Sequence, residues 1–154
     1  MGVMARLPLL RSPQSPDPHP EQGRHPRVYS LRTDARIESA HVEAARLNQP
    51  LQVRSGTVEL PSTARIEPVH GTAVIDAVKQ AFDGSGDLVI RIHEAEGARS
   101  RVRLLLDRDG CVSEVDLLED PIDEPTQQLP ASTCSKVELT LRPFQILTLR
   151  VSQR

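Results

Sequence analysis

The chain has 154 residues, enough for one domain with a hydrophobic core, and its formal net charge is −2. A nearly balanced charge argues against nucleic acid or an anionic membrane as a partner held by bulk electrostatics. No apolar run approaches membrane-spanning length, and the start of the chain is too short and too interrupted for a signal peptide. We therefore expect a cytoplasmic protein without a nucleic-acid or membrane partner. With one Tyr, two Phe and no Trp, the chain is also poor in the rings that form sugar platforms.

Residues 11–24 are predicted to form a loop, because repeated prolines remove backbone donors and restrict the residues before them. The short apolar segments at 7–10 and 28–31 flank this loop, and both are predicted as strands. Residues 37–47 have apolar positions at helical spacing and are followed by Asn48 and Pro50, which predicts one short helix.

The proline-stiffened loop and its C-terminal flank carry Arg11, Asp17 and His25, hydrogen-bonding groups held at low entropic cost. Such a loop suits the lip of a sugar subsite, so these three residues are the candidate substrate-side residues. The alternative is an ordinary connecting loop ordered by its prolines.

The rest of the chain is predicted to be mostly β, in short segments separated by turn residues. These segments are 51–53, 64–69, 88–93, 101–106, 112–118, 136–141 and 146–151. Residues 74–82 have helical composition, but the reversal signal at 83–86 directly before a strand favours a strand there. The predicted fold class is therefore mainly β: an antiparallel β-sandwich with at most one or two short helices.

Residues 88–106 are predicted to form a hairpin, because apolar positions alternate on both sides of a turn at Glu96-Gly97. In this interpretation Glu94 is a solvated residue that could pair with Arg99 across the turn. The remaining acids on strands or turns, among them Asp76, Asp87 and Asp116, are also interpreted as solvated.

Neither the cysteines nor the histidines have the spacing of a metal site or a disulfide framework. Cys111 and Cys134 are predicted to be unpaired thiols. The five histidines contain no His-x-x-x-His pair. We expect no metal ligand, no catalytic residue and no cofactor in this chain.

Several phrases, in chain order, are similar to one enzyme family. The stretch LVIRIHEAEGARSRVRL at 88–104, the tetrapeptide DLLE at 116–119 and the ending LTLRPFQILTLR at 139–150 carry the resemblance. Together they resemble the C-terminal β-rich region of glycoside hydrolase family 38, the α-mannosidases, in its bacterial branch. His93 departs from the family pattern, which usually has Tyr there.

The resemblance implies a role without chemistry of its own. Family 38 enzymes are retaining glycosidases that use a carboxylate nucleophile, an acid and a zinc ion. The resemblance places those groups in an N-terminal catalytic domain larger than this chain, so we expect a fragment that is inactive alone. Its expected role is structural support to a catalytic domain supplied in trans, with mannosides bound at most weakly. Residues 1–35 would form the proline-rich loop with its flanking strands and 36–154 the sandwich, within one domain overall. A stand-alone carbohydrate-binding module and a non-functional truncated remnant are the alternatives.

Overall fold

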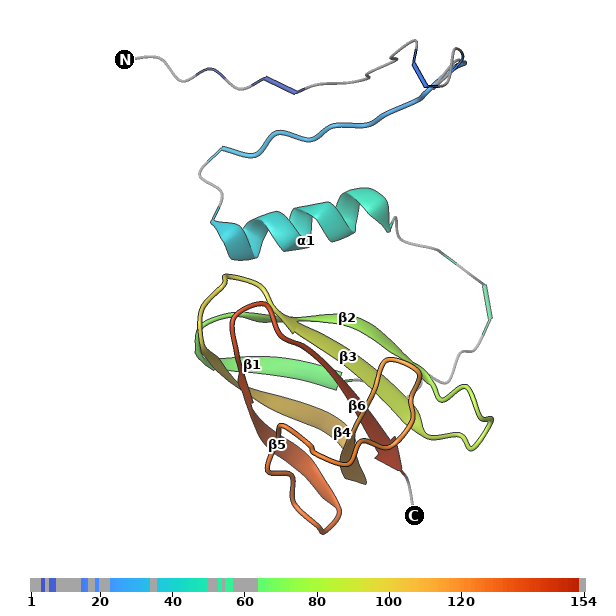
Figure 1. Ribbon diagram of the computed structural model, residues 1–154, viewed down its shortest axis with the longest axis vertical. Helices are drawn as coiled ribbons and strands as arrows, with labels where there is room; N and C mark the ends of the chain where they lie inside the picture. Colours follow the sequence, from blue (N-terminus) through green and yellow to red (C-terminus); the bar gives the residue numbers. More distant parts are fainter. Residues whose placement is uncertain are drawn as a thin grey trace. The chain divides into compact units, whose positions relative to one another are not determined.

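The computed structural model of the protein describes residues 4, 6–7, 15–16, 19, 23–33, 36–49, 53, 55–56 and 64–152. The chain divides into two compact units, Met1–Arg32 and Thr33–Arg154. The predicted grouping of both into one domain stays a prediction. The second unit contains the helix and all the strands of the described residues (Figure 1). They are α1 (Ile37–Asn48), β1 (Ala64–His70), β2 (Ala73–Gln80), β3 (Leu88–Glu94), β4 (Ser100–Val115), β5 (Cys134–Leu141) and β6 (Ile146–Ser152).

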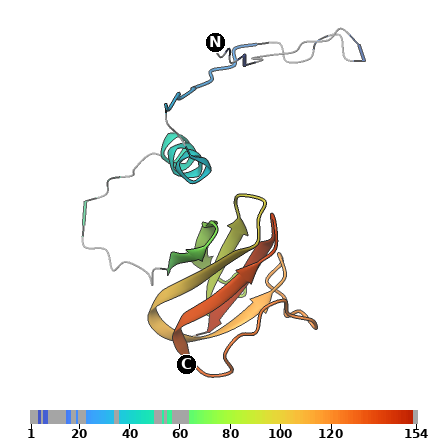
Figure 2. The same cartoon turned by 90° about the vertical axis from the view of Figure 1, so that its left-hand side faces the viewer.

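The strands form a six-stranded antiparallel sheet in the order β1-β4-β6-β3-β2, with β5 also paired to β4. The 16-residue strand β4 belongs to two parts of this sheet. Its first half pairs with β1 and β5, and its residues 111–115 pair with β6. The sheet therefore curls into a half-barrel, which is visible when the strands are viewed from the side (Figure 2). The predicted class, mainly β and antiparallel with one short helix, is confirmed.

The core fills the inside of this curl with aliphatic side chains. Alternating positions of β3, β4, β5 and β6 point inward, as the sequence pattern predicts. The buried cluster consists of Leu88, Ile90, Ile92, Val102, Leu104, Leu106, Val112, Val137, Leu139, Leu141, Leu147, Leu149 and Val151. Burial of this apolar surface is the main source of stability for the fold.

Two predicted strands, 101–106 and 112–118, are in fact one strand, β4, which ends at Val115. The polar residues 107–109, which suggest a turn, are exposed on a continuous but irregular strand. The register shifts between Leu105 and Gly110. A Cβ at Gly110 would lie 2.4 Å from Val151 Cγ1, so the missing side chain allows β6 to approach closely. The strand thus changes partners where the prediction expects a break.

The predicted hairpin over 88–106 is wrong. β3 pairs with β2 and β6, whereas β4 pairs with β1, β5 and β6, so the two strands are not neighbours. The turn at 95–99 instead passes from one part of the curled sheet to the other. Periodicity identifies strands and their inward faces, but it does not identify their partners.

The other predicted elements have mixed outcomes. The helix and the strand at 74–82 are confirmed as α1 and β2, and the reversal at 83–86 joins β2 to β3. The strand predicted at 28–31 is wrong: these residues have no regular structure and are exposed. The strands predicted at 7–10 and 51–53 lie outside the described residues, except for Leu7 and Val53, which are not in strands.

Candidate functional site

The three predicted substrate-side residues are not brought together by the described structure. Arg11 and Asp17 lie outside the described residues. His25 is exposed and belongs to the first unit, in a segment without regular structure. Their role at a sugar subsite stays a prediction.

The fold fully buries one carboxylate of the described residues, that of Glu94, beside the equally buried hydroxyl of Ser100. Glu94 is 0% exposed, on the inward face of β3 in phase with Ile90 and Ile92. Its Oε1 accepts the Glu96 N–H at 3.0 Å and the hydroxyl of Ser100 at 3.1 Å. The interpretation of Glu94 as a solvated residue is wrong.

The second oxygen of Glu94, Oε2, accepts two further backbone donors, the N–H of Gly97 at 2.8 Å and that of Phe144 at 2.9 Å. The predicted partner Arg99 is exposed, and backbone amides take its place. Neither carboxylate oxygen is therefore left without a donor.

The protonation state of Glu94 follows from these donors. Burial alone raises the pKa of this carboxyl, but the N–H groups of Phe144, Glu96, Ala98 and Gly97 outweigh burial and lower the pKa to about 2. The side chain is therefore an anion at neutral pH. A carboxylate with so low a pKa cannot serve as a general acid, and its oxygens are already occupied by donors. It is a structural anchor.

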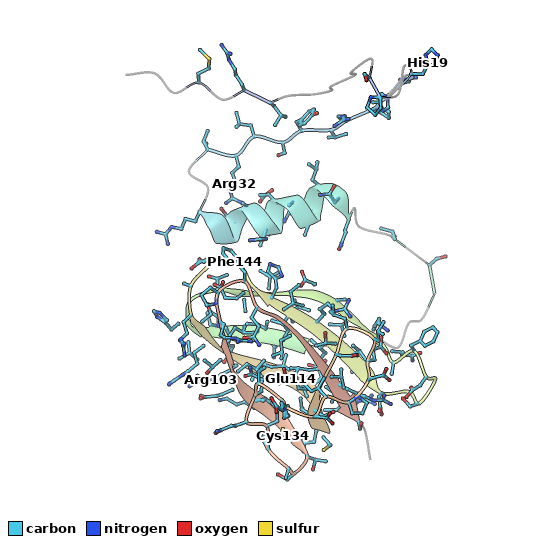
Figure 3. All side chains as sticks on the ribbon, in the orientation of Figure 1. His19, Arg32, Arg103, Glu114, Cys134 and Phe144 are labelled. Atoms are coloured by element: carbon cyan, nitrogen blue, oxygen red, sulfur yellow. The ribbon has the colours of Figure 1, made fainter. Side chains whose placement is uncertain are left out.

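This anchor joins three loops at one end of the sheet. Ser100 Oγ also accepts the Thr72 N–H at 3.1 Å, and Thr72 Oγ1 donates to Glu96 Oε1 at 2.8 Å. The loops at 71–72, 95–99 and 142–145 thus share one hydrogen-bond network. Phe144, at the tip of the third loop, has a positive φ of 56° and an exposed side chain (Figure 3). We call this the Glu94 network.

A second polar cluster closes the reversal between β2 and β3 against β6. Arg150 Nε donates to Asp87 Oδ2 at 2.7 Å, and its Nη2 donates to Asp83 Oδ2 at 2.6 Å and to Ser85 Oγ at 3.0 Å. Hydrogen bonds from Ser85, followed by the one from Arg150, lower the pKa of Asp83 to about 2. Asp87, interpreted from sequence as solvated, is instead half-buried and also accepts from Ser152 Oγ at 2.9 Å.

A groove of about 890 Å³ lies beside β4 and β6, under the loop that follows β4. Glu114, labelled in Figure 3, holds this loop by accepting the N–H groups of Thr126 at 2.7 Å and Gln127 at 2.9 Å. The buried amide of Gln127 then bonds both backbone groups of Thr140 on β5, each at 3.0 Å. The groove lining consists of aliphatic, proline and polar side chains, including Ser113, Gln128, Arg150 and Ser152.

Gln127→Ala is expected to lower the free energy of unfolding by about 2 kcal/mol, because it removes two bonds to a strand backbone from a buried position. Urea denaturation measures the change, and amide hydrogen exchange at Thr140 should become faster. Gln128→Ala is the matched control, since Gln128 is exposed. Equal midpoints for the two variants would contradict the role assigned to Gln127.

The described residues do not fit a zinc ion. No group of three or more His, Cys, Asp or Glu that could hold a metal occurs among them. His93 Nδ1 lies 2.8 Å from Asp76 Oδ2. The His41 ring meets the His93 ring edge-on, with 5.5 Å between the two ring centroids. These contacts form a His–Asp pair and a ring contact, not a set of metal ligands. Cys111 and Cys134 are free thiols, and burial raises the pKa of Cys134 (Figure 3). In the described part of the chain, no helix is long and apolar enough to cross a bilayer.

Comparison with known proteins identifies the family. Residues 72–149, from the turn before β2 to the middle of β6, match the glycosyl hydrolases family 38 C-terminal beta sandwich domain. The chain belongs to this family. Human alpha-mannosidase 2C1 is 32% identical over 158 residues, which cover 96% of this chain and 15% of the relative. Mouse alpha-mannosidase 2C1 gives the same values, and alpha-mannosidase G of Dictyostelium discoideum is 31% identical over 63% of this chain and 10% of its own length.

The family 38 chain therefore spans only a small part of the curated relatives that it resembles. The matched region contains β2 to β5, most of β6 and the loops that Glu94 holds, but not β1, and the predicted resemblance is confirmed. Sequence reasoning missed Glu94, although a signal exists: Glu94 continues the inward series of Leu88, Ile90 and Ile92. No comparable signal marks Gln127 or Arg150, whose partners come from distant segments.

Proposed function

We propose that this chain serves as the C-terminal β-sandwich domain of an α-mannosidase and supports a catalytic domain against which it packs, in trans or within one polypeptide. The observation that carries the proposal is the family 38 match over residues 72–149, which takes in most of the folded sheet. The chain matches 15% of the length of human alpha-mannosidase 2C1, so the activity would reside in other parts of such an enzyme.

The internal structure supports a scaffold role. Glu94, a fully buried anion, holds the loops at 95–99 and 142–145 by direct hydrogen bonds, and Ser100 and Glu96 connect the loop at 71–72 to them. The bonds of Arg150 fix the turn between β2 and β3 at the other end of β3. Loops held in this way can present a defined surface to a neighbouring domain with little loss of conformational entropy on docking. The described lining of the groove beside β4 contains no aromatic ring on which a sugar could stack. We therefore favour a scaffold role over that of a stand-alone carbohydrate-binding module.

The proposal is tested by replacing the matched region of human alpha-mannosidase 2C1 with this chain. The chimera should be soluble and hydrolyse an aryl α-mannoside, whereas the human protein with the region deleted should not. The isolated chain is expected to be inactive, because the proposal places the catalytic groups in other parts of the enzyme. A chimera as inactive as the deletion variant would contradict the proposal, and so would turnover by the isolated chain that survives removal of contaminants.

A further inference from the structure

The reversal that follows β4 is built rigidly. Asp116 Oδ1 accepts the N–H of Leu118 at 2.8 Å and that of Asp120 at 2.9 Å, and the Asp116 N–H donates to Asp120 O at 2.9 Å. Glu119 has a φ of 76°, in the left-handed region that residues with a Cβ rarely adopt. Its N–H donates to Asp116 O at 3.2 Å. The backbone of 116–120 therefore has one defined conformation.

Glu119 also fastens this reversal to the end of β2. Its carboxylate forms an ion pair with Lys79 and accepts the N–H of Phe82 at 2.7 Å. The bonds from Lys79, and then the one from Phe82, lower the pKa of Glu119. From β3, Arg91 Nη2 donates to Leu117 O at 3.2 Å. Two segments that are far apart in the sequence are thus held together around one carboxylate.

The side chains that these segments carry are apolar and point to solvent. Phe82 is 92% exposed, Leu117 60% and Leu118 79%. A mobile loop could turn its leucines inward, but this reversal is held by hydrogen bonds on both sides and a left-handed backbone position. Fixed exposure of large apolar side chains is typical of an interaction surface. We call these three residues the apolar patch.

We propose that the apolar patch docks into an apolar recess on the catalytic part of an α-mannosidase. The inference rests on the proposed function and names the surface through which that function operates. The length of the relatives indicates what the patch would contact. The curated relatives continue far beyond the region that this chain matches, so the sandwich has a large neighbour in them. The charges nearest the patch also fit this occupant, because two ion pairs, Lys79 with Glu119 and Asp83 with Arg150, form within the chain. These four charges would stay compensated on docking against an apolar recess.

The test introduces Leu117→Asp and Leu118→Asp together into the chimera with human alpha-mannosidase 2C1. Hydrolysis of an aryl α-mannoside in the soluble fraction should fall by roughly tenfold or more, since charge on an apolar anchor opposes docking. Leu31→Asp is the matched control: Leu31 is 91% exposed but belongs to the first unit, outside the patch and the Glu94 network, and activity should be retained. Urea denaturation of the full 154-residue chain carrying the same changes should give the wild-type midpoint, which separates lost docking from lost folding.

Each other outcome contradicts the proposal in a distinguishable way. An active chimera that keeps its activity with both aspartates overturns the docking surface and leaves the proposed function standing. An inactive unsubstituted chimera contradicts the proposed function itself. Another possible occupant of the patch is a second copy of this chain, and sedimentation of the isolated chain tests it. A dimer that dissociates with Leu117→Asp and Leu118→Asp would assign the patch to this second copy and overturn the proposal.

Discussion

Glu94→Gln is expected to lower the free energy of unfolding by about 3 kcal/mol, because an amide cannot accept hydrogen bonds at both of its ends. If the NH2 group takes the place of Oε2, the N–H groups of Gly97 and Phe144 lose their acceptor. If it takes the place of Oε1, the Glu96 N–H is stranded. The substitution keeps the shape of the side chain, so the change isolates the hydrogen bonding. Urea denaturation at about pH 7 measures it.

The pH dependence of stability provides a second readout of the same carboxylate. The pKa of Glu94 falls from an ordinary 4.5 to about 2 in the folded protein. The contribution of this carboxylate to the free energy of unfolding is therefore fully present above pH 4.5 and is lost as the pH falls from 4.5 toward 2. The wild type should lose more stability over this interval than Glu94→Gln. Glu138→Gln is the control: Glu138 is exposed and pairs with Arg103 at 3.2 Å, so the expected loss is about 0–1 kcal/mol. Identical urea midpoints for Glu94→Gln and the wild type would refute the role of Glu94 as a structural anchor.

Gly71→Ala is expected to cost about 3 kcal/mol, and Gly84→Ala only about 1 kcal/mol. The two glycines have nearly the same positive φ, 72° and 73°. A Cβ at Gly71 would lie 2.2 Å from Ser100 Oγ and 3.1 Å from Ser100 Cα, whereas a Cβ at Gly84 meets nothing within 4 Å. Both substitutions therefore strain the backbone, but only the first displaces the buried hydroxyl that bridges Glu94 and Thr72.

Thermal or urea unfolding of the two alanine variants measures this difference directly. Because both glycines have nearly the same positive φ, the additional loss of unfolding free energy in Gly71→Ala reports the displacement of Ser100 from the Glu94 network. Two variants of equal stability would show that the hydroxyl moves aside at no cost and would contradict the close packing of the three loops.

Most of the strands could be predicted from the sequence, because a buried face leaves an alternating pattern. Residues 88, 90 and 92 on β3 and 147, 149 and 151 on β6 show it clearly. The reversal at 83–86 also predicted that β2 precedes β3 as its neighbour, but the pairing of β3 with β6 could not be predicted, since β6 comes from the end of the chain. The turn at 96–97 has the composition of a hairpin turn but connects strands that are not neighbours. Local chemistry specifies a reversal, while the partner depends on distant segments.

The polar networks escaped prediction for a related reason. Carboxylates on a strand are normally solvated, and only three-dimensional context shows that loops 95–99 and 142–145 bring backbone N–H groups to Glu94. Arg150 and Asp83 are likewise 67 residues apart in the chain. The candidate substrate-side residues Arg11, Asp17 and His25 come from a pattern of prolines and polar groups, and that prediction stands untested.

The long strand β4 has a consequence for how the fold comes apart. The backbone of β4 forms hydrogen bonds in both portions of the curled sheet, with β1 and β5 in one and with β6 in the other. Unfolding of either portion would therefore remove hydrogen bonds from the other. We therefore expect the two portions to unfold together in a single transition, which coincident urea curves from two probes would show.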